Sequence, residues 1–141
     1  MTIQQISIFL ENKFGKLNEI LSLISKEQIR IIAATVADTS EFGILRILTS
    51  DPQKAFKVLK NNNISANISE VFAIVTESVP GQFARTIEYF TRAGISIEYM
   101  YCFSTKVTGI LVIRVNDTET AREVIRRKNL QTIDQIGLKE I

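Results

Sequence analysis

The sequence contains no histidine, no tryptophan and only one cysteine in 141 residues. The lack of histidine removes the side chain that proteins use most often as a general base and as a metal ligand. Cys102, standing alone, can form neither an internal disulfide nor a thiolate cluster for zinc, and it fits a reducing cytoplasm. We therefore expect no metal, no cofactor and no catalytic residues. An enzyme built on this chain would have to work with Glu, Arg or Lys alone.

Long apolar runs and an excess of charge of one sign are also missing. Eighteen apolar residues never follow one another, and the first residues lack the basic start and apolar stretch of a signal peptide. The 17 basic and 15 acidic residues are spread along the chain and leave a formal net charge of +2. We expect a globular protein with no membrane segment, no export and no face for nucleic acid.

An internal repeat organises the chain. Shifted by 66 positions, residues 11–63 align with residues 77–129 without a gap. The identities fall on turn glycines and on apolar positions with strand or helix spacing, whereas chance matches would scatter. They include Gly15 with Gly81, Ile29 with Ile95, Ile31 with Ile97, Gly43 with Gly109, and Asn63 with Asn129. We interpret the pattern as a duplication, with domains at residues 1–69 and 70–141.

Each repeat predicts the element order βαββαβ, from apolar residues with strand or helix spacing and from a cap at Asp51 with Pro52. The first repeat predicts strands at 3–10, 29–36, 43–49 and 64–68, and helices at 16–28 and from Pro52 to 61–63. The second predicts strands at 71–76, 95–103, 109–115 and 130–141, and helices at 80–92 and 118–128. Right-handed crossovers then give the α+β fold class: two tandem ferredoxin-like units, antiparallel sheets with the helices on one face.

The loops before the first helix of each repeat resemble the ACT family. Leu-Glu-Asn-Lys-Phe-Gly-Lys-Leu at 10–17 and Thr-Glu-Ser-Val-Pro-Gly-Gln-Phe at 76–83 resemble its signature, in which a strand ends in Asn or Asp and Pro-Gly-x-Leu opens a helix. Gln-Ile-Arg-Ile at 28–31 and Gly-Ile-Ser-Ile at 94–97 resemble its Gly-Val-Asn-Ile strand start. The resemblance covers both repeats. It implies tandem ACT domains, which bind amino acids at the interface between paired units and regulate amino-acid metabolism.

The two loops, the helix starts and one strand residue are the candidate ligand-binding residues. They are Asn12, Lys13, Phe14, Gly15, Lys16, Leu17, Ser78, Val79, Pro80, Gly81, Gln82 and Glu98. Free N–H groups in the first turn of a helix favour a carboxylate, and a glycine lets the ligand approach. Asn12 can donate to that carboxylate and accept from the ammonium group. For a single copy, each glycine would more simply serve a tight turn, and the resemblance reverses that preference.

Two features of the second strand of the second repeat, predicted at 95–103, each allow a binding role or a structural role. Glu98 would receive the ligand ammonium group or select a basic side chain, although such a residue is more often a solvated strand position. Tyr99, Met100, Tyr101 and Phe103 would line a pocket for an apolar side chain, but an aromatic strand usually serves core or subunit packing. We favour packing for this cluster.

The leading hypothesis is a cytoplasmic homodimer that binds an amino acid and regulates an enzyme of amino-acid metabolism. We expect it to act in trans on that enzyme, because the 141 residues hold no fused catalytic or DNA-binding domain. The alternative is a purely structural dimerisation module, in which Gly15→Ala or Asn12→Ala would change stability and no ligand response. RNA binding shares the element order but ranks low, since the strands predicted at 43–49 and 109–115 lack the aromatic residues that stack on bases.

Overall fold

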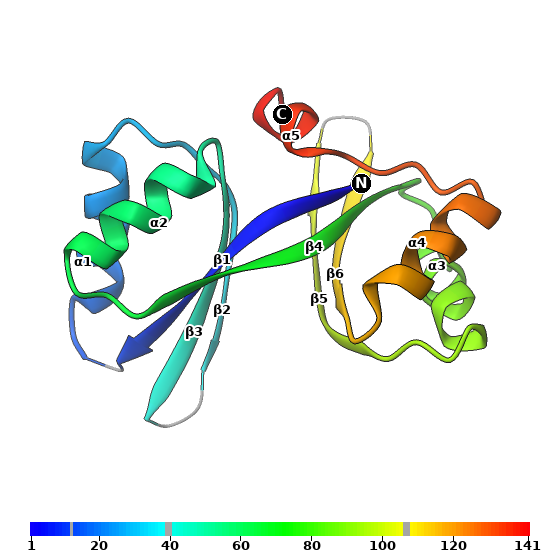
Figure 1. The fold of residues 1–141 in the computed structure, drawn as a ribbon, viewed down its shortest axis with the longest axis horizontal. Coiled ribbons are helices and arrows are strands. Elements are labelled where there is room, and N and C mark those ends of the chain that lie inside the picture. The colour runs from blue at the N-terminus through cyan, green and yellow to red at the C-terminus, as the bar shows by residue number, and fades with distance from the viewer. Residues whose placement is uncertain (12, 39–40, 106–107) are drawn as a thin grey trace. The chain divides into compact units, whose positions relative to one another are not determined.

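The computed structural model describes residues 1–11, 13–38, 41–105 and 108–141, and it divides into two compact units. The first unit is Gln4–Ser69, and the second is Glu70–Ile141 together with Met1–Ile3. The elements are β1 (Thr2–Glu11), α1 (Lys16–Lys26), β2 (Ile31–Asp38), β3 (Phe42–Thr49), α2 (Pro52–Asn61), β4 (Ala66–Thr76), α3 (Gln82–Arg92), β5 (Ile97–Ser104), β6 (Gly109–Val115), α4 (Thr118–Arg127) and α5 (Gln135–Lys139) (Figure 1). No helix in the described ranges is long and apolar enough to cross a bilayer.

The first unit packs both of its helices on one face of its strands (Figure 1). β3 pairs antiparallel with β1 on one side and with β2 on the other. Ile6 and Ile8 of β1 lie opposite Ile47 and Leu45 of β3, and all four are buried. The helices add Ile20, Ile24, Ala55 and Leu59 to the same core. One face of each strand therefore supplies the core, as the predicted alternation requires.

The second unit repeats this arrangement. β6 pairs antiparallel with β4 and with β5. Phe72 and Ile74 of β4 lie opposite Ile113 and Leu111 of β6 and form the core with Phe90 of α3. From α4 the core receives Ala121, Val124 and Ile125. The α+β fold class with two ferredoxin-like units is confirmed.

The duplication extends to details of the backbone. The side chains of Asp51 and Asp117 each cap a helix by accepting a hydrogen bond from the backbone N–H three residues later. Asn63 and Asn129, beyond the ends of the same helices, have left-handed φ angles of 58° and 52°. Since neither detail is needed for hydrophobic patterning alone, the two units share local geometry as well as element order.

The prediction of a strand at 130–141 is wrong. In the described part of the chain, this segment forms one isolated bridge, from Thr132 to Ile74 of β4, and the Ile133 N–H donates to the Ala73 carbonyl at 2.9 Å. The chain then turns into α5, because the Asp134 carboxylate accepts a hydrogen bond from the Gly137 N–H at 2.7 Å and caps the helix.

The strands predicted separately at 64–68 and 71–76 are parts of one strand, β4. No glycine or proline stands between Ala66 and Thr76 to interrupt it. The last strand of the first repeat therefore continues directly into the first strand of the second repeat.

Candidate functional site

Two glycine bends lead into α1 and α3. Gly15 and Gly81 have φ angles of 80° and 84°, in the left-handed region where a residue with a Cβ atom is strained. Among the described residues, neither helix start has a side-chain cap. A Cβ atom placed on either glycine would lie more than 4 Å from every described atom outside that glycine and its two chain neighbours. The space beside each bend is therefore open.

The first turn of α3 holds unpaired hydrogen-bond donors. The backbone N–H groups of Gln82 and Arg85 donate to loop carbonyls at 3.3 and 3.0 Å. Those of Phe83 and Ala84 have no partner among the residues that the structure describes. The corresponding groups of α1 are those of Leu17 and Asn18. Donors of this kind, at the positive end of a helix dipole, suit an anion such as a carboxylate.

A surface groove runs from the second bend along α3. One hollow of about 470 Å³ lies at the loop and is lined by Glu77, Ser78, Val79, Pro80, Gly81, Phe83 and Ala84. A second, of about 760 Å³, lies between α3 and β5 and is lined by Gly81, Phe83, Ala84, Arg85, Ile87, Glu88, Thr91 and Met100. Because Gly81, Phe83 and Ala84 line both hollows, we treat them as one groove.

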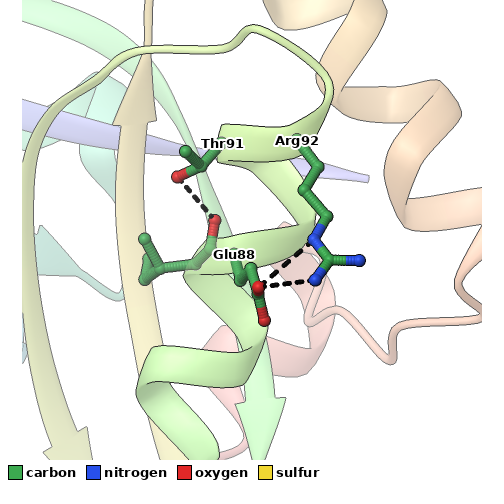
Figure 2. A network of polar contacts seen from close by, with 4 residues as sticks. Glu88, Thr91 and Arg92 are labelled. Atoms are coloured by element: carbon green, nitrogen blue, oxygen red, sulfur yellow. Dashed lines mark hydrogen bonds and ion pairs between the residues drawn. The ribbon is translucent and has the colours of Figure 1, made fainter.

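Several polar groups along this groove already bind one another, as Figure 2 shows. The Arg92 guanidinium donates to the Glu88 carboxylate from Nε at 3.2 Å and from Nη2 at 2.8 Å. The Thr91 hydroxyl donates to the Ile87 carbonyl at 3.2 Å. Within the described ranges, no group of three or more His, Cys, Asp or Glu side chains is placed to hold a metal ion.

The candidate residues of the first loop are mostly exposed, and its two lysines lie close to neighbouring carboxylates. Lys13 forms an ion pair with Glu11 at 2.8 Å, and this hydrogen bond lowers the pKa of the Glu11 carboxyl and raises the pKa of Lys13. Lys16 lies 3.6 Å from Glu19. Phe14 is fully exposed. Asn12 lies outside the described residues.

The candidate residues of the second loop come together, and Glu98 does not join them. Ser78, Val79, Pro80 and Gly81 line the groove. Glu98 forms an ion pair with Arg114 at 3.6 Å and does not line the groove. Glu98 comes after the C-terminal end of α3 in the chain. That helix has 11 residues and extends about 16 Å away from the bend at its N-terminal end.

Eight groove residues were not among the candidates: Glu77, Phe83, Ala84, Arg85, Ile87, Glu88, Thr91 and Met100. Phe83 and Ile87 stand four residues apart, so they share a helix face, and this spacing is the sequence signal that would have found them. Met100 belongs to the aromatic cluster for which we favoured packing, but its side chain lines the groove and is 44% exposed.

Comparison with known families identifies the fold and its relatives. The family model described as an ACT domain pair matches residues 1–141. The chain belongs to the ACT domain pair family. No curated protein matches the sequence.

Solved structures resemble this ACT domain pair over most of its length. Protein BT0572 from Bacteroides thetaiotaomicron is 38% identical, with a TM-score of 0.94 over 100% of this chain and 98% of that one. The regulatory subunit of aspartate kinase from Thermus thermophilus, in a ligand-free form, is 17% identical, with a TM-score of 0.64 over 87% and 88%. The Thermus flavus regulatory subunit is 17% identical, with a TM-score of 0.60 over 88% and 90%. At 17% identity, the two subunits share the fold.

Proposed function

We propose that this ACT domain pair is a cytoplasmic regulatory protein that binds a free amino acid and controls an enzyme of amino-acid metabolism in trans, without catalytic residues of its own. The family and the fold shared with aspartate kinase regulatory subunits support this proposal. We further propose that residues 1–69 and 70–141 are separate ACT domains and that the chain forms a homodimer.

The observation that carries the proposal is the open bend at Gly81. Its first-turn donors, the N–H groups of Phe83 and Ala84, are unpaired in the described part of the chain and adjoin a groove. A ligand carboxylate placed there would accept both hydrogen bonds and interact favourably with the helix dipole. Since Gly81 has no Cβ atom, the carboxylate can approach the backbone closely.

Regulation then requires a difference in affinity. A bound amino acid shifts the protein only if it binds one arrangement of the molecule, or one state of a partner enzyme, more tightly than another. In the proposed role, occupancy of the loop changes self-association or binding to the enzyme. The proposed contacts are the candidate residues of the two loops and helix starts, residues 12–17 and 78–82.

Thermal unfolding in the presence of each of the twenty amino acids tests the proposal. A ligand present at about 100 times its dissociation constant adds roughly 2.7 kcal/mol to the free energy of unfolding and raises Tm. We expect at least one amino acid to do so in a concentration-dependent way. A Tm that none of the twenty changes, in a protein that still forms dimers in analytical ultracentrifugation, would point to a structural module instead.

The variants Gly15→Ala and Gly81→Ala test where the ligand lies. The added methyl group meets no described atom beyond the neighbouring residues of the chain, but it occupies the space beside the bend. We expect the variant at the occupied bend to lose its Tm response to the ligand, while the other variant retains it. Equal responses in both variants and in the wild type would remove the bends from the site.

A further inference from the structure

The repeat allows the charges around the two bends to be compared position by position. In the first unit Glu11 is paired with Lys13 at 2.8 Å, and Glu19 lies 3.6 Å from Lys16. Both of these acidic side chains therefore have a cation of the same unit beside them. A zwitterionic ligand would have to compete with these pairs for either of its charges.

The corresponding charges of the second unit have lost their partners. Glu77 occupies the position of Glu11, but Val79 replaces the lysine. Within the described ranges the Glu77 carboxylate has no ion-pair or hydrogen-bond partner, and it lines the hollow at the loop. An α-amino acid carries an ammonium group next to its carboxylate, and Glu77 is placed to accept from it.

Arg85 replaces Glu19, so the charge at this position is reversed. The Arg85 side chain lines the groove and, among the residues that the structure describes, has no ion-pair or hydrogen-bond partner. A guanidinium binds a carboxylate through parallel charge-assisted hydrogen bonds. A glutamate at the same place repels it. The second bend is therefore matched to a carboxylate, and the first is not.

The remainder of the groove is matched to an apolar side chain. Phe83 is 37% exposed and Met100 is 44% exposed, and both line the groove beside Ile87. The Glu88 carboxylate is already bound by Arg92, so it does not favour a cationic side chain (Figure 2). In the first unit Leu17, Leu21 and Ala34 stand at the three apolar positions, so the long Met100 side chain has only a methyl group as its counterpart.

We infer that the second unit alone binds the ligand, an α-amino acid with an uncharged apolar side chain. Glu77 receives its ammonium group, Arg85 and the first-turn N–H groups receive its carboxylate, and its side chain lies between α3 and β5 against Phe83 and Met100. This inference rests on the proposed function and specifies the ligand class and the occupied unit.

Isothermal titration calorimetry of the whole chain with L-leucine, L-isoleucine, L-methionine and L-phenylalanine tests it, with L-lysine and L-aspartate as charged comparisons. We expect the tightest binding from one of the first four, with one ligand per chain. Binding of two ligands per chain, or tightest binding of a charged amino acid, would overturn the inference while leaving amino-acid binding intact.

Matched variants locate the site. Glu77→Gln and Arg85→Gln each remove the charge-assisted hydrogen bonds of one side chain and should weaken binding about tenfold or more. Glu11→Gln and Glu19→Gln, the controls at the corresponding positions of the first unit, should leave affinity unchanged. The reverse pattern would place the ligand in the first unit.

Truncated ligands separate the two roles. If L-leucine is the tightest ligand, 4-methylpentanoate lacks only its ammonium group, so wild type and Glu77→Gln should bind it with equal affinity. Arg85→Gln should still weaken its binding about tenfold. Equal losses in both variants would contradict the assigned roles. If no amino acid binds the wild type at all, the proposed function itself fails, and this outcome is distinct from each of the others.

Discussion

The two units of this chain have similar backbone arrangements around the glycine bend and the helix caps, and they differ in the side chains near the bend. Both have a left-handed glycine before the first helix, an aspartate cap on the second helix and a buried face of the same design. Around the bend, however, Glu11 and Glu19 are paired, whereas Glu77 and Arg85 have no partner in the described part of the chain. The features that the units share are those that the fold requires. These four charged side chains lie on the surface, where substitutions have little effect on stability and can change ligand binding.

Alanine substitutions in the two cores should have the largest effect on the free energy of unfolding. The loss should be similar in both units. Ile24 and Phe90 correspond in the repeat, and both are fully buried. Ile24→Ala should cost about 2–5 kcal/mol and Phe90→Ala about 3–5 kcal/mol, from lost burial and the cavity left behind. Chemical denaturation measures both. Phe14→Ala, at a fully exposed side chain, should stay within about 0.5 kcal/mol. A loss below 1 kcal/mol at either core position would show that the units differ in their cores.

Substitutions at the residue after the C-cap of α1 and of α3 should change the stability in opposite directions. Gln28 has a left-handed φ of 61°, and its counterpart Gly94 has a φ of 76°. Gln28→Gly should relieve strain and raise stability by about 0.5–1 kcal/mol, and Gly94→Ala should lower it by about 1 kcal/mol. Denaturant midpoints report both changes. If both substitutions destabilise the protein, Gln28 is held by contacts that glycine cannot make.

Glu98 should have a small effect on stability and none on the ligand. Its partner Arg114 lies 3.6 Å away and both side chains are partly exposed, so Glu98→Gln should cost at most about 0.5 kcal/mol. The first unit has Ile32 at this position. Calorimetry with the best amino-acid ligand should give the wild-type affinity. A clear loss of affinity would return Glu98 to the binding site.

The Asp117 helix cap of the second unit should have the smallest effect on stability. The loss of this stabilisation should be seen as the pH is lowered. Hydrogen bonds from the Thr120 side chain and backbone N–H lower the pKa of Asp117. Because the folded-state pKa lies below the unfolded value, the stabilisation is present above the unfolded value of about 3.9 and is lost as pH falls through the folded one. Asp117→Asn can still accept the cap hydrogen bond but does not titrate. Its Tm should therefore fall less than that of the wild type between about pH 5 and pH 2. Parallel Tm profiles would show that the unfolded state retains the same hydrogen bonds.

Predictions from the sequence were most accurate where a residue pattern repeats. The two glycine bends and the Asp51 cap were predicted because a turn or a helix start depends on neighbouring residues. The strand at 130–141 was predicted from its apolar residues and its place in the repeat, but Asp134 caps a helix there instead. Aligning the two repeats at the offset of 66 residues also places Arg85 opposite Glu19. This charge reversal can therefore be found from the sequence alone.

The linear order of residues already contains the duplication, the βαββαβ pattern and the open glycine bends, because each depends on spacing along the chain. Folding in three dimensions decides which charged groups pair and which side chains share a groove. Glu98 of β5 pairs with Arg114 of β6, and Met100 of β5 lies along α3. These contacts depend on distances of a few ångströms between side chains, and often between separate elements, which residue spacing does not specify.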